Sequence, residues 1–306
     1  MGNYFNCHAH TMYSNIRLLD CINRPKALID KAIELGLSGI AITDHESLGA
    51  HMEVNMYAKK LQQTHPDFKI ALGNEIYLVD SRDRGQKYYH FILLAKDAEG
   101  HKALRKLSSI AWYNSYTDRG MERVPLLKAE LAKVMSDYKG HVIATTACMG
   151  GELSTNALNM SDAESVGDYA NAKIYYENII NFISFCTDTF GSDFYLECAP
   201  STAENQIRVN QKIFKIAQAY KIKMVVGTDA HYMTVDDRLV HKAYLNSKGG
   251  EREVDAFYEF ARLMDYDECA NLLSLSFNKN LEIPKWILEN TLEIQNKIEY
   301  YSLEKV

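Results

Sequence analysis

The sequence predicts an α/β fold in which seven strands, mostly separated by helices, close into a barrel of TIM-like type. Short apolar segments typical of buried strands alternate with amphipathic helical segments through most of the 306 residues. Such alternation forms either a closed barrel or an open, doubly wound sheet. Residues able to bind metals lie in or just after these strands along most of the chain. A barrel brings the ends of its strands to one mouth, so we prefer the seven-unit barrel.

The strands and helices can be placed in order from apolar periodicity and helix-boundary residues. The seven predicted strands span residues 4–10, 39–43, 70–79, 88–96, 141–145, 193–198 and 223–228. The predicted helices span residues 24–35, 47–63, 98–113, 126–138 and 203–220, with one or two more within residues 162–190. Pro25 and Pro125 are typical of a first helical turn, and Gly36 of a helix end.

One connection breaks the alternation. Only a polar loop, residues 80–87, separates the third and fourth strands, and it is too short for a crossover helix. We therefore expect these two strands to form an antiparallel hairpin. The pairing would set His90 opposite the neighbourhood of Tyr77 and close to Glu75.

The chain is expected to contain two units. Residues 1–245 would form the barrel, and residues 246–306 a helical extension in which residues 251–275 and 284–298 show amphipathic patterns. The extension contains no predicted strand and no candidate ligand.

The composition is typical of a globular protein of the cytoplasm. Hydrophobic residues make up 47% of the chain and charged residues 24%. The net charge of −6 argues against a strongly basic nucleic-acid coat, although a local basic rim remains compatible with it. We find no membrane-length apolar run and no signal sequence. The six cysteines show no disulfide spacing, which favours a reducing compartment.

Two short motifs place metal-binding side chains on the first and last strands. His8 and His10 are two residues apart, so their imidazoles lie on the same face of a strand. Asp229 and His231 repeat this spacing at the end of the last strand. Either pair alone is a weak signal, since such pairs also occur without a metal, but the two pairs strengthen each other.

Other candidate ligands are found at intermediate strands. Glu75 interrupts an apolar strand, where a buried carboxylate needs a cation or another partner. His45 ends the second strand, and we expect Asp44 to orient it; alternatively Asp44 caps a helix and His45 is exposed. Cys148 follows the fifth strand and could equally be a small buried thiol.

Together these side chains form a mixed donor set of five imidazoles, three carboxylates and one thiolate. The full set is His8, His10, Asp20, His45, Glu75, His90, Cys148, Asp229 and His231. This mixture suits Zn²⁺, Mn²⁺ or Fe²⁺ better than Mg²⁺ or Ca²⁺, which prefer all-oxygen shells. Nine donors are enough for three divalent ions.

Several motifs, in order, resemble the PHP (polymerase and histidinol phosphatase) family, and within it the N-terminal PHP domain of bacterial DNA polymerase III α subunits. These motifs are His8-Ala9-His10-Thr11, Thr43-Asp44-His45, Gly73-Asn74-Glu75-Ile76-Tyr77, Tyr89-His90, Ala147-Cys148, Phe194-Tyr195-Leu196-Glu197 and Thr228-Asp229-Ala230-His231-Tyr232. The resemblance covers roughly residues 3–245. It implies a distorted (β/α)7 barrel with three metal ions.

The resemblance also implies how the donors divide among the ions. The implied sets are His8, His10, Glu75 and Asp229 for one ion, Glu75, His90 and Cys148 for a second, and Asp20, His45 and His231 for a third. A short insertion at residues 15–17 places Asp20 further behind the histidine pair than is usual in the family.

The metal-binding residues predict phosphodiester hydrolysis, and the resemblance implies 3′–5′ exonuclease or proofreading activity on DNA and a polymerase or replisome partner. The candidate catalytic residues are Glu75, Asp229 and His231. Metal ions at such a centre activate water and neutralise charge on phosphorus. One alternative is a phosphatase of small molecules or nucleotides, of the histidinol-phosphatase type. The other is a non-catalytic module associated with a polymerase.

Basic and aromatic residues of the loops are candidates for binding the substrate, although such arginines are often merely solvated. They are Arg17, Arg82, Arg84, Lys87, Tyr116, Arg119 and Arg123.

Overall fold

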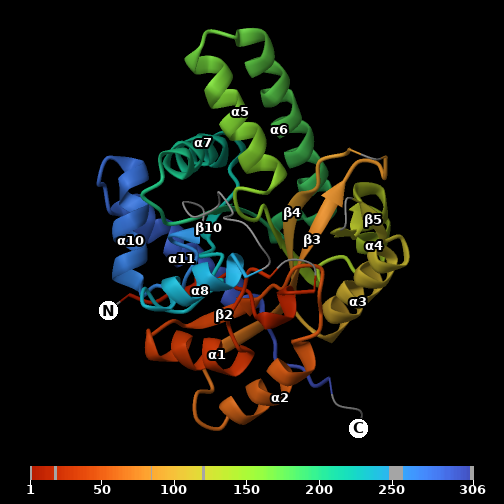
Figure 1. Cartoon of the computed structure of the whole chain (residues 1–306), viewed down its shortest axis with the longest axis vertical. Coiled ribbons are helices and arrows are strands. Elements are labelled where there is room, and N and C mark those ends of the chain that lie inside the picture. The colour runs from red at the N-terminus through yellow and green to blue at the C-terminus, as the bar shows by residue number, and fades with distance from the viewer. Residues whose placement is uncertain (1, 17–18, 84, 119–120, 248–257, 304–306) are drawn as a thin grey trace.

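The computed structural model describes residues 2–16, 19–83, 85–118, 121–247 and 258–303, and shows a nearly closed barrel of seven strands (Figure 1). In spatial order the strands are β1 (Phe5–Asn6), β2 (Gly39–Ile42), β3 (Lys69–Val79), β4 (Tyr89–Ala95), β8 (Val142–Thr145), β9 (Phe194–Cys198) and β10 (Met224–Val226). Backbone hydrogen bonds from Cys7 N to Val226 O (3.4 Å) and from His10 N to Ala230 O (3.0 Å) join the first and last strands. The predicted α/β barrel is confirmed.

Strand β4 runs against its neighbours, as the short loop before it predicts. It pairs antiparallel with both β3 and β8, whereas the other neighbouring pairs on the barrel path are parallel. In the β3–β4 register His90 lies opposite Tyr77. The reversal puts the start of β4 at the same end of the barrel as the carboxyl ends of the other strands.

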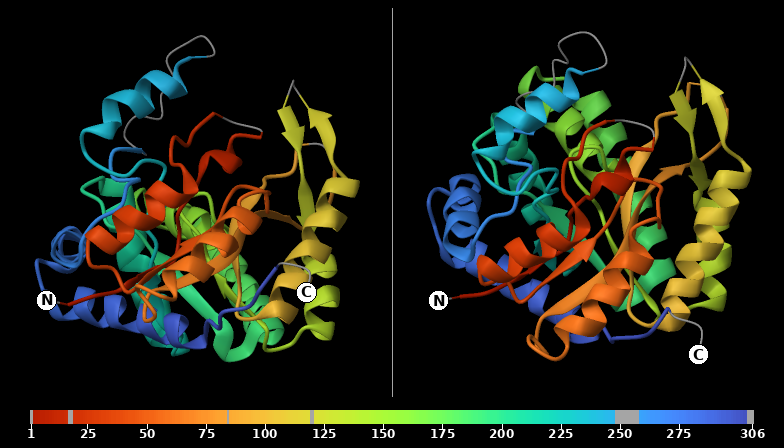
Figure 2. Two further views of the ribbon diagram at one scale, coloured as in Figure 1. Left: turned by 90° about the horizontal axis from the view of Figure 1, so that it is seen from below. Right: turned by 60° about the horizontal axis from the view of Figure 1, so that its bottom comes forward.

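Helices surround the barrel and close one of its ends. They are α1 (Pro25–Glu34), α2 (His51–Leu61), α3 (Ala98–Tyr113), α4 (Lys128–Asp137), α5 (Glu152–Ser165), α6 (Tyr169–Phe190), α7 (Glu204–Tyr220), α8 (Asp237–Leu245), α10 (Tyr266–Ser274) and α11 (Glu282–Lys297), with short 3₁₀ helices at Met12–Ser14, Gly191–Asp193 and Leu275–Phe277. Ile294 and Ile298 join the apolar side chains inside the barrel. Figure 2 shows α11 crossing one end of the barrel, with α8 and a small hairpin at the other.

The elements differ locally from those predicted. The first strand, predicted over residues 4–10, is limited to Phe5–Asn6, so His8 and His10 follow it, and helix α8 was not predicted. Residues 125–127, predicted as the start of a helix, form the short strand β7 (Pro125–Leu127), which pairs with β3. Residues 116–123 contain an unpredicted hairpin, β5 (Tyr116–Asp118) with β6 (Met121–Arg123). Helix α5 begins ten residues before the predicted start at 162, because its buried face packs against α6 in a pair that extends from the barrel (Figure 1).

The C-terminal segment differs from the predicted long helix over residues 251–275, of which 251–257 lie outside the described residues. Residues 259–265 are not helical, because this stretch packs against Tyr232, which forms a bridge with Arg262 and donates its hydroxyl to the carbonyls of Tyr258 and Glu259. Helix α10 starts only after Asp265, which caps it. The division at residue 245 stays a prediction. Within the described residues no helix is long and apolar enough to cross a membrane.

A buried histidine pair between α2 and α3 predicts loss of stability in acid. His51 Nε2 donates to Gly73 O (2.8 Å), and His51 Nδ1 lies 3.0 Å from His101 Nε2. Burial lowers the pKa of His51 to about 3 and that of His101 to about 4. The unfolded chain takes up these protons below about pH 6.5, so each histidine should cost about 1.4 kcal/mol of unfolding free energy per pH unit between that value and its folded pKa, about 4 for His101 and about 3 for His51.

This prediction can be measured by urea unfolding at pH 7 and pH 5. The His101→Gln variant, which keeps a hydrogen-bond donor but cannot titrate, should lose less stability on acidification than the wild type. Equal losses in both proteins would contradict the role of this pair.

Candidate metal centre

The candidate ligands lie together at the end of the barrel opposite α11. His8 and His10 follow β1, His45 follows β2, and Asp229 follows β10. Glu75 lies within β3, where its backbone N–H donates to Asp44 O (3.1 Å) and its carbonyl accepts from Glu46 N (2.9 Å). Backbone hydrogen bonds between neighbouring strands therefore fix the strand ends, and the strand ends position the donors.

Glu75 is the central carboxylate of the cluster and is fully buried. Its Oε2 lies 2.7 Å from His8 Nε2 and 3.2 Å from His10 Nε2. Its Oε1 lies 3.2 Å from His45 Nδ1 and contacts His90 Nδ1. One side chain thus touches four imidazoles, two with each oxygen.

Asp229 faces the same two imidazoles as Glu75 Oε2. Its Oδ1 lies 3.2 Å from His8 Nε2 and 3.1 Å from His10 Nε2. His8, His10, Glu75 and Asp229 form a group whose donor atoms all lie within 4.8 Å of one another. This group coincides with the first set implied by the family resemblance.

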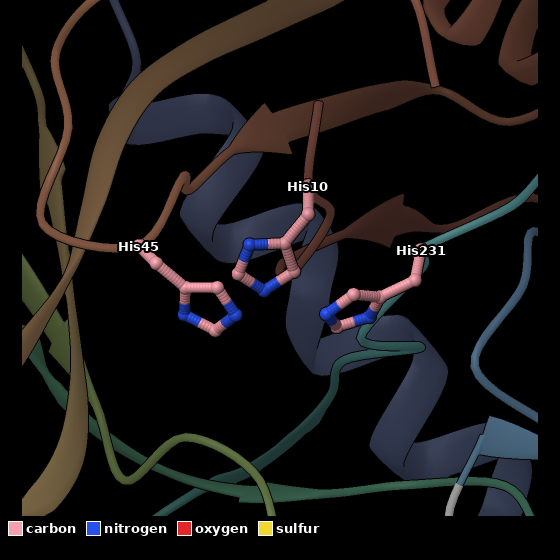
Figure 3. A group of neighbouring side chains, drawn as sticks. All are labelled: His10, His45 and His231. Carbon is pink, nitrogen blue, oxygen red and sulfur yellow. The ribbon is translucent and has the colours of Figure 1, made fainter. Parts of the chain in front are cut away.

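A second group consists of imidazoles alone. His10 lies between His45 and His231 (Figure 3). The centroid of its ring is 4.2 Å from that of His45 and 4.4 Å from that of His231. Asp20, buried at the edge of this group, places Oδ2 3.5 Å from His45 Nε2. The structure therefore brings Asp20, His45 and His231 to one region, with His10 among them.

The third group contains His45, Glu75 and His90. Cys148 lies beside it, with Sγ 3.5 Å from His90 Nδ1. Gly150 makes this approach feasible, because a Cβ atom there would lie 2.9 Å from the His90 ring. Cys148 thus reaches the centre through His90, although it is outside the compact group of donors.

Several imidazoles are held so that one ring nitrogen points into the cluster. Glu197 Oε1 lies 2.7 Å from His8 Nδ1, Ser14 Oγ 3.0 Å from His10 Nδ1, and the Asp229 carbonyl 2.7 Å from His231 Nδ1. If each Nδ1–H donates outward, each Nε2 keeps its lone pair for the centre. Metal-binding histidines are commonly oriented in this way.

Glu197 supports the cluster and is not among the ligands predicted from the sequence. It is buried in β9, contacts both His8 and Thr145, and approaches His8 because Gly227 has no side chain; a Cβ there would lie 2.2 Å from Glu197 Oε1. A carboxylate in an apolar strand was the signal that identified Glu75, and it applies equally to Glu197.

The expected role of Asp44 is corrected by its contacts. Its carboxylate accepts from Thr11 N (2.6 Å), Thr11 Oγ1 (2.8 Å) and Ser14 Oγ (2.7 Å) rather than from His45. Since Ser14 contacts His10, Asp44 supports His10. The cause is the short 3₁₀ turn after Thr11, which places Ser14 between the side chains of His10 and Asp44.

The charges of the cluster compensate one another. Burial would raise the pKa of Glu75 and of Asp229, but neighbouring imidazoles outweigh it and hold both pKa values well below their ordinary range. Burial opposes protonation of His8, yet Asp229 and Glu197 raise its pKa well above the ordinary value. Burial and His10 lower the pKa of His231 to about 4.

The donors fit divalent cations because some of their buried atoms have no hydrogen bond within the described structure. These atoms are Asp20 Oδ1 and His231 Nε2, whereas His45 Nδ1 and Asp229 Oδ1 contact only other members of the cluster. Unsatisfied polar atoms are costly to bury, and a shared cation would satisfy several at once. The clusters are therefore consistent with a multinuclear metal site.

Three of the six described non-glycine residues with a positive φ lie at the same place. Glu46, Ala147 and Asp229 have φ angles of 51°, 58° and 48°. Non-glycine residues in this region cost roughly 1–3 kcal/mol each and accumulate at functional sites. Two of these residues adjoin candidate ligands and the third is one.

The predicted substrate-binding residues are placed less uniformly. Arg17, Arg84 and Arg119 lie outside the described residues. Arg82 pairs with Glu130. The Arg123 guanidinium lies 5.3 Å from the centre of the Tyr88 ring, whose hydroxyl contacts that of Tyr116. Lys87 donates to Thr155 Oγ1 (3.2 Å).

Comparison with known proteins gives the family context. Residues 6–201 match the PHP domain model. The chain is 42% identical over 310 aligned residues to the probable DNA polymerase YorL of Bacillus subtilis (strain 168), covering 97% of the chain and 24% of that protein. It is 30% identical over 241 aligned residues to DNA polymerase III subunit alpha of Borreliella burgdorferi, covering 76% of the chain and 18% of the relative. The chain thus spans about a quarter or less of these relatives.

Similar solved structures are more distant. A putative metal-dependent phosphoesterase from Bifidobacterium adolescentis has a TM-score of 0.45 and 15% identity, with 76% of this chain and 89% of that one covered. Histidinol phosphate phosphatase from Lactococcus lactis has a TM-score of 0.40 and 12% identity, with 81% and 94% covered. The sequence comparisons settle the family: this chain belongs to the PHP domain family and is similar to the PHP regions of bacterial and phage DNA polymerases.

Proposed function

We propose that the chain is a metal-dependent phosphodiesterase that removes nucleotides from the 3′ end of DNA. The observation that carries the proposal is the buried Glu75, which contacts four imidazoles and belongs to two of the three overlapping donor groups. A carboxylate has two oxygen donors, so Glu75 could be shared between neighbouring ions. Similarity to DNA polymerases over 97% of the chain favours DNA as the substrate and a polymerase as the associated protein.

The proposed ligands are the nine residues predicted from the sequence, with His10 also able to contribute to the imidazole group. When bound, the divalent ions would lower the pKa of water and neutralise charge on the phosphoryl oxygens. Zinc and manganese suit these donors, and iron is also compatible with them.

The chain's own residues prepare the site for this chemistry. Glu197 and Ser14 hold His8 and His10 with Nε2 inward, which reduces the rearrangement needed when a ligand binds. Glu75, Asp229 and His231 are the proposed catalytic residues, because they would hold the divalent ions that supply this chemistry. Arg123, Tyr88 and Tyr116 form a cationic and aromatic cluster suited to an entering strand.

The decisive experiment is a nuclease assay on single-stranded DNA labelled at its 5′ end, with Mn²⁺ or Zn²⁺ supplied. We expect stepwise shortening and release of mononucleotides, and no release in the presence of a chelator. Turnover of a phosphate monoester without any turnover of the oligonucleotide would instead indicate a small-molecule phosphatase. Bound metal without turnover of either would indicate a non-catalytic module.

A further inference from the structure

A cavity of about 210 Å³ opens beside the metal centre. Its walls come from the segments after β8, β9 and β10 and from residues 260–261. Cys148 and Asp229 belong both to this cavity and to the candidate ligands. A group bound in the cavity would therefore lie next to a ligand bound at the metal centre.

The cavity walls are largely apolar. Met149, Pro200 and Phe260 line it together with small alanine side chains. Phe260 is half-buried, so part of its ring is available for contact. The volume is below the roughly 300–1,000 Å³ typical of pockets for drug-sized ligands, which favours a single small ring system.

Polar groups at the cavity supply both a donor and an acceptor. Asn205 accepts from Arg208 through its amide oxygen, which leaves its NH₂ group as a donor. Gln206 donates to Asn210 through Nε2, which leaves its oxygen as an acceptor. Thr228, which also lines the cavity, has a buried hydroxyl with no hydrogen bond within the described structure.

We propose that this cavity holds the nucleobase of the 3′-terminal nucleotide while its phosphate lies at the metal centre. Apolar and aromatic walls suit the faces of a base, and side-chain amides suit its edge. The inference rests on the proposed phosphodiesterase function and adds the substrate's recognition site. Because the amides would occupy the base's pairing edge, the terminal nucleotide must be unpaired to enter.

The test compares two single-stranded oligonucleotides that differ only at the 3′ terminus, one with a normal nucleotide and one with an abasic sugar. With Mn²⁺ the wild type should cleave the normal terminus with a kcat/KM roughly 5- to 150-fold higher, the range expected from base stacking. A fluorescent purine at the terminus should also change its emission on binding when a chelator prevents turnover.

Two variants distinguish the effect of filling the cavity from general effects of a bulky substitution on the protein. Ala203→Phe fills the cavity and should make the kcat/KM values for the two oligonucleotides equal. Neither the terminal base nor the abasic sugar could then contact the cavity walls. Ala219→Phe, at the exposed far end of helix α7, which Ala203 precedes, should behave as the wild type. If Ala203→Phe does not fold, Phe260→Ala, which removes an aromatic wall, should still reduce the difference.

The outcomes distinguish the two proposals. Equal cleavage of both termini by the wild type, or a full difference retained in a folded Ala203→Phe protein, would overturn the base site while leaving the phosphodiesterase intact. Failure of the metal-loaded wild type to cleave either oligonucleotide would overturn the proposed function, and this inference with it.

Discussion

Glu75→Gln is expected to lower hydrolysis of single-stranded DNA on the order of 10²–10³-fold or more, the loss typical when a key electrostatic group of an active site is removed. The substitution keeps the shape of the side chain but removes the charge that faces four imidazoles. The amide nitrogen would also present a donor where the arrangement requires an acceptor. Both metal content and turnover should therefore fall together.

The measurement combines elemental analysis with the rate of mononucleotide release. Glu293→Gln is the matched control, because Glu293 contacts Tyr195 and Lys297 at the α11 end of the barrel, away from the centre. It should retain its metal and its rate. A Glu75→Gln protein that turns over DNA within tenfold of the wild type would show that the reaction occurs elsewhere.

The overall fold was predictable because the strands carry strong, simple signals. Apolar runs located the seven strands, and the length of the loop at residues 80–87 gave the antiparallel hairpin and the neighbourhood of His90. Chain connectivity leaves few ways to join two strands through so short a loop. Signals of this kind are local, so one sequence is sufficient to read them.

The errors occurred where tertiary packing outweighs local preference. Pro125 resembles a helix start, yet it begins β7, where pairing with β3 decides the conformation. Residues 152–161 are rich in polar side chains and resemble a loop, but helix α5 gains its stability by packing on α6. Neither effect is encoded in the periodicity of the segment itself.

The site shows the same division. The convergence of His8, Glu75 and Asp229 follows from their places on strands of one barrel. The contacts that orient them do not, because Asp44 could face His45 or Ser14 equally well until the turn after Thr11 is known. Sequence therefore identifies candidate donors more readily than the residues that support them.

Removing the metals is expected to lower the thermal midpoint by about 4 °C for each ion lost. An ion present at 100 times its dissociation constant stabilises the folded state by about 2.7 kcal/mol. A chain of this length has an unfolding entropy near 0.6 kcal/mol per kelvin, which converts that energy into about 4 °C. Three ions would shift the midpoint by roughly 12 °C at that concentration.

The midpoint shifts because buried polar atoms without a hydrogen bond destabilise the folded state, and a bound cation removes this cost. Asp20 Oδ1 and His231 Nε2 have no hydrogen bond within the described structure, and the unfolded chain would return them to water. Thermal melts with zinc, with manganese and with a chelator would measure the effect. The His8→Ala/Glu75→Ala protein should show a much smaller difference between metal and chelator, since two shared donors are gone. If the wild type loses its ions without any change in midpoint, the cluster is stable by itself, and the argument from its unsatisfied atoms fails.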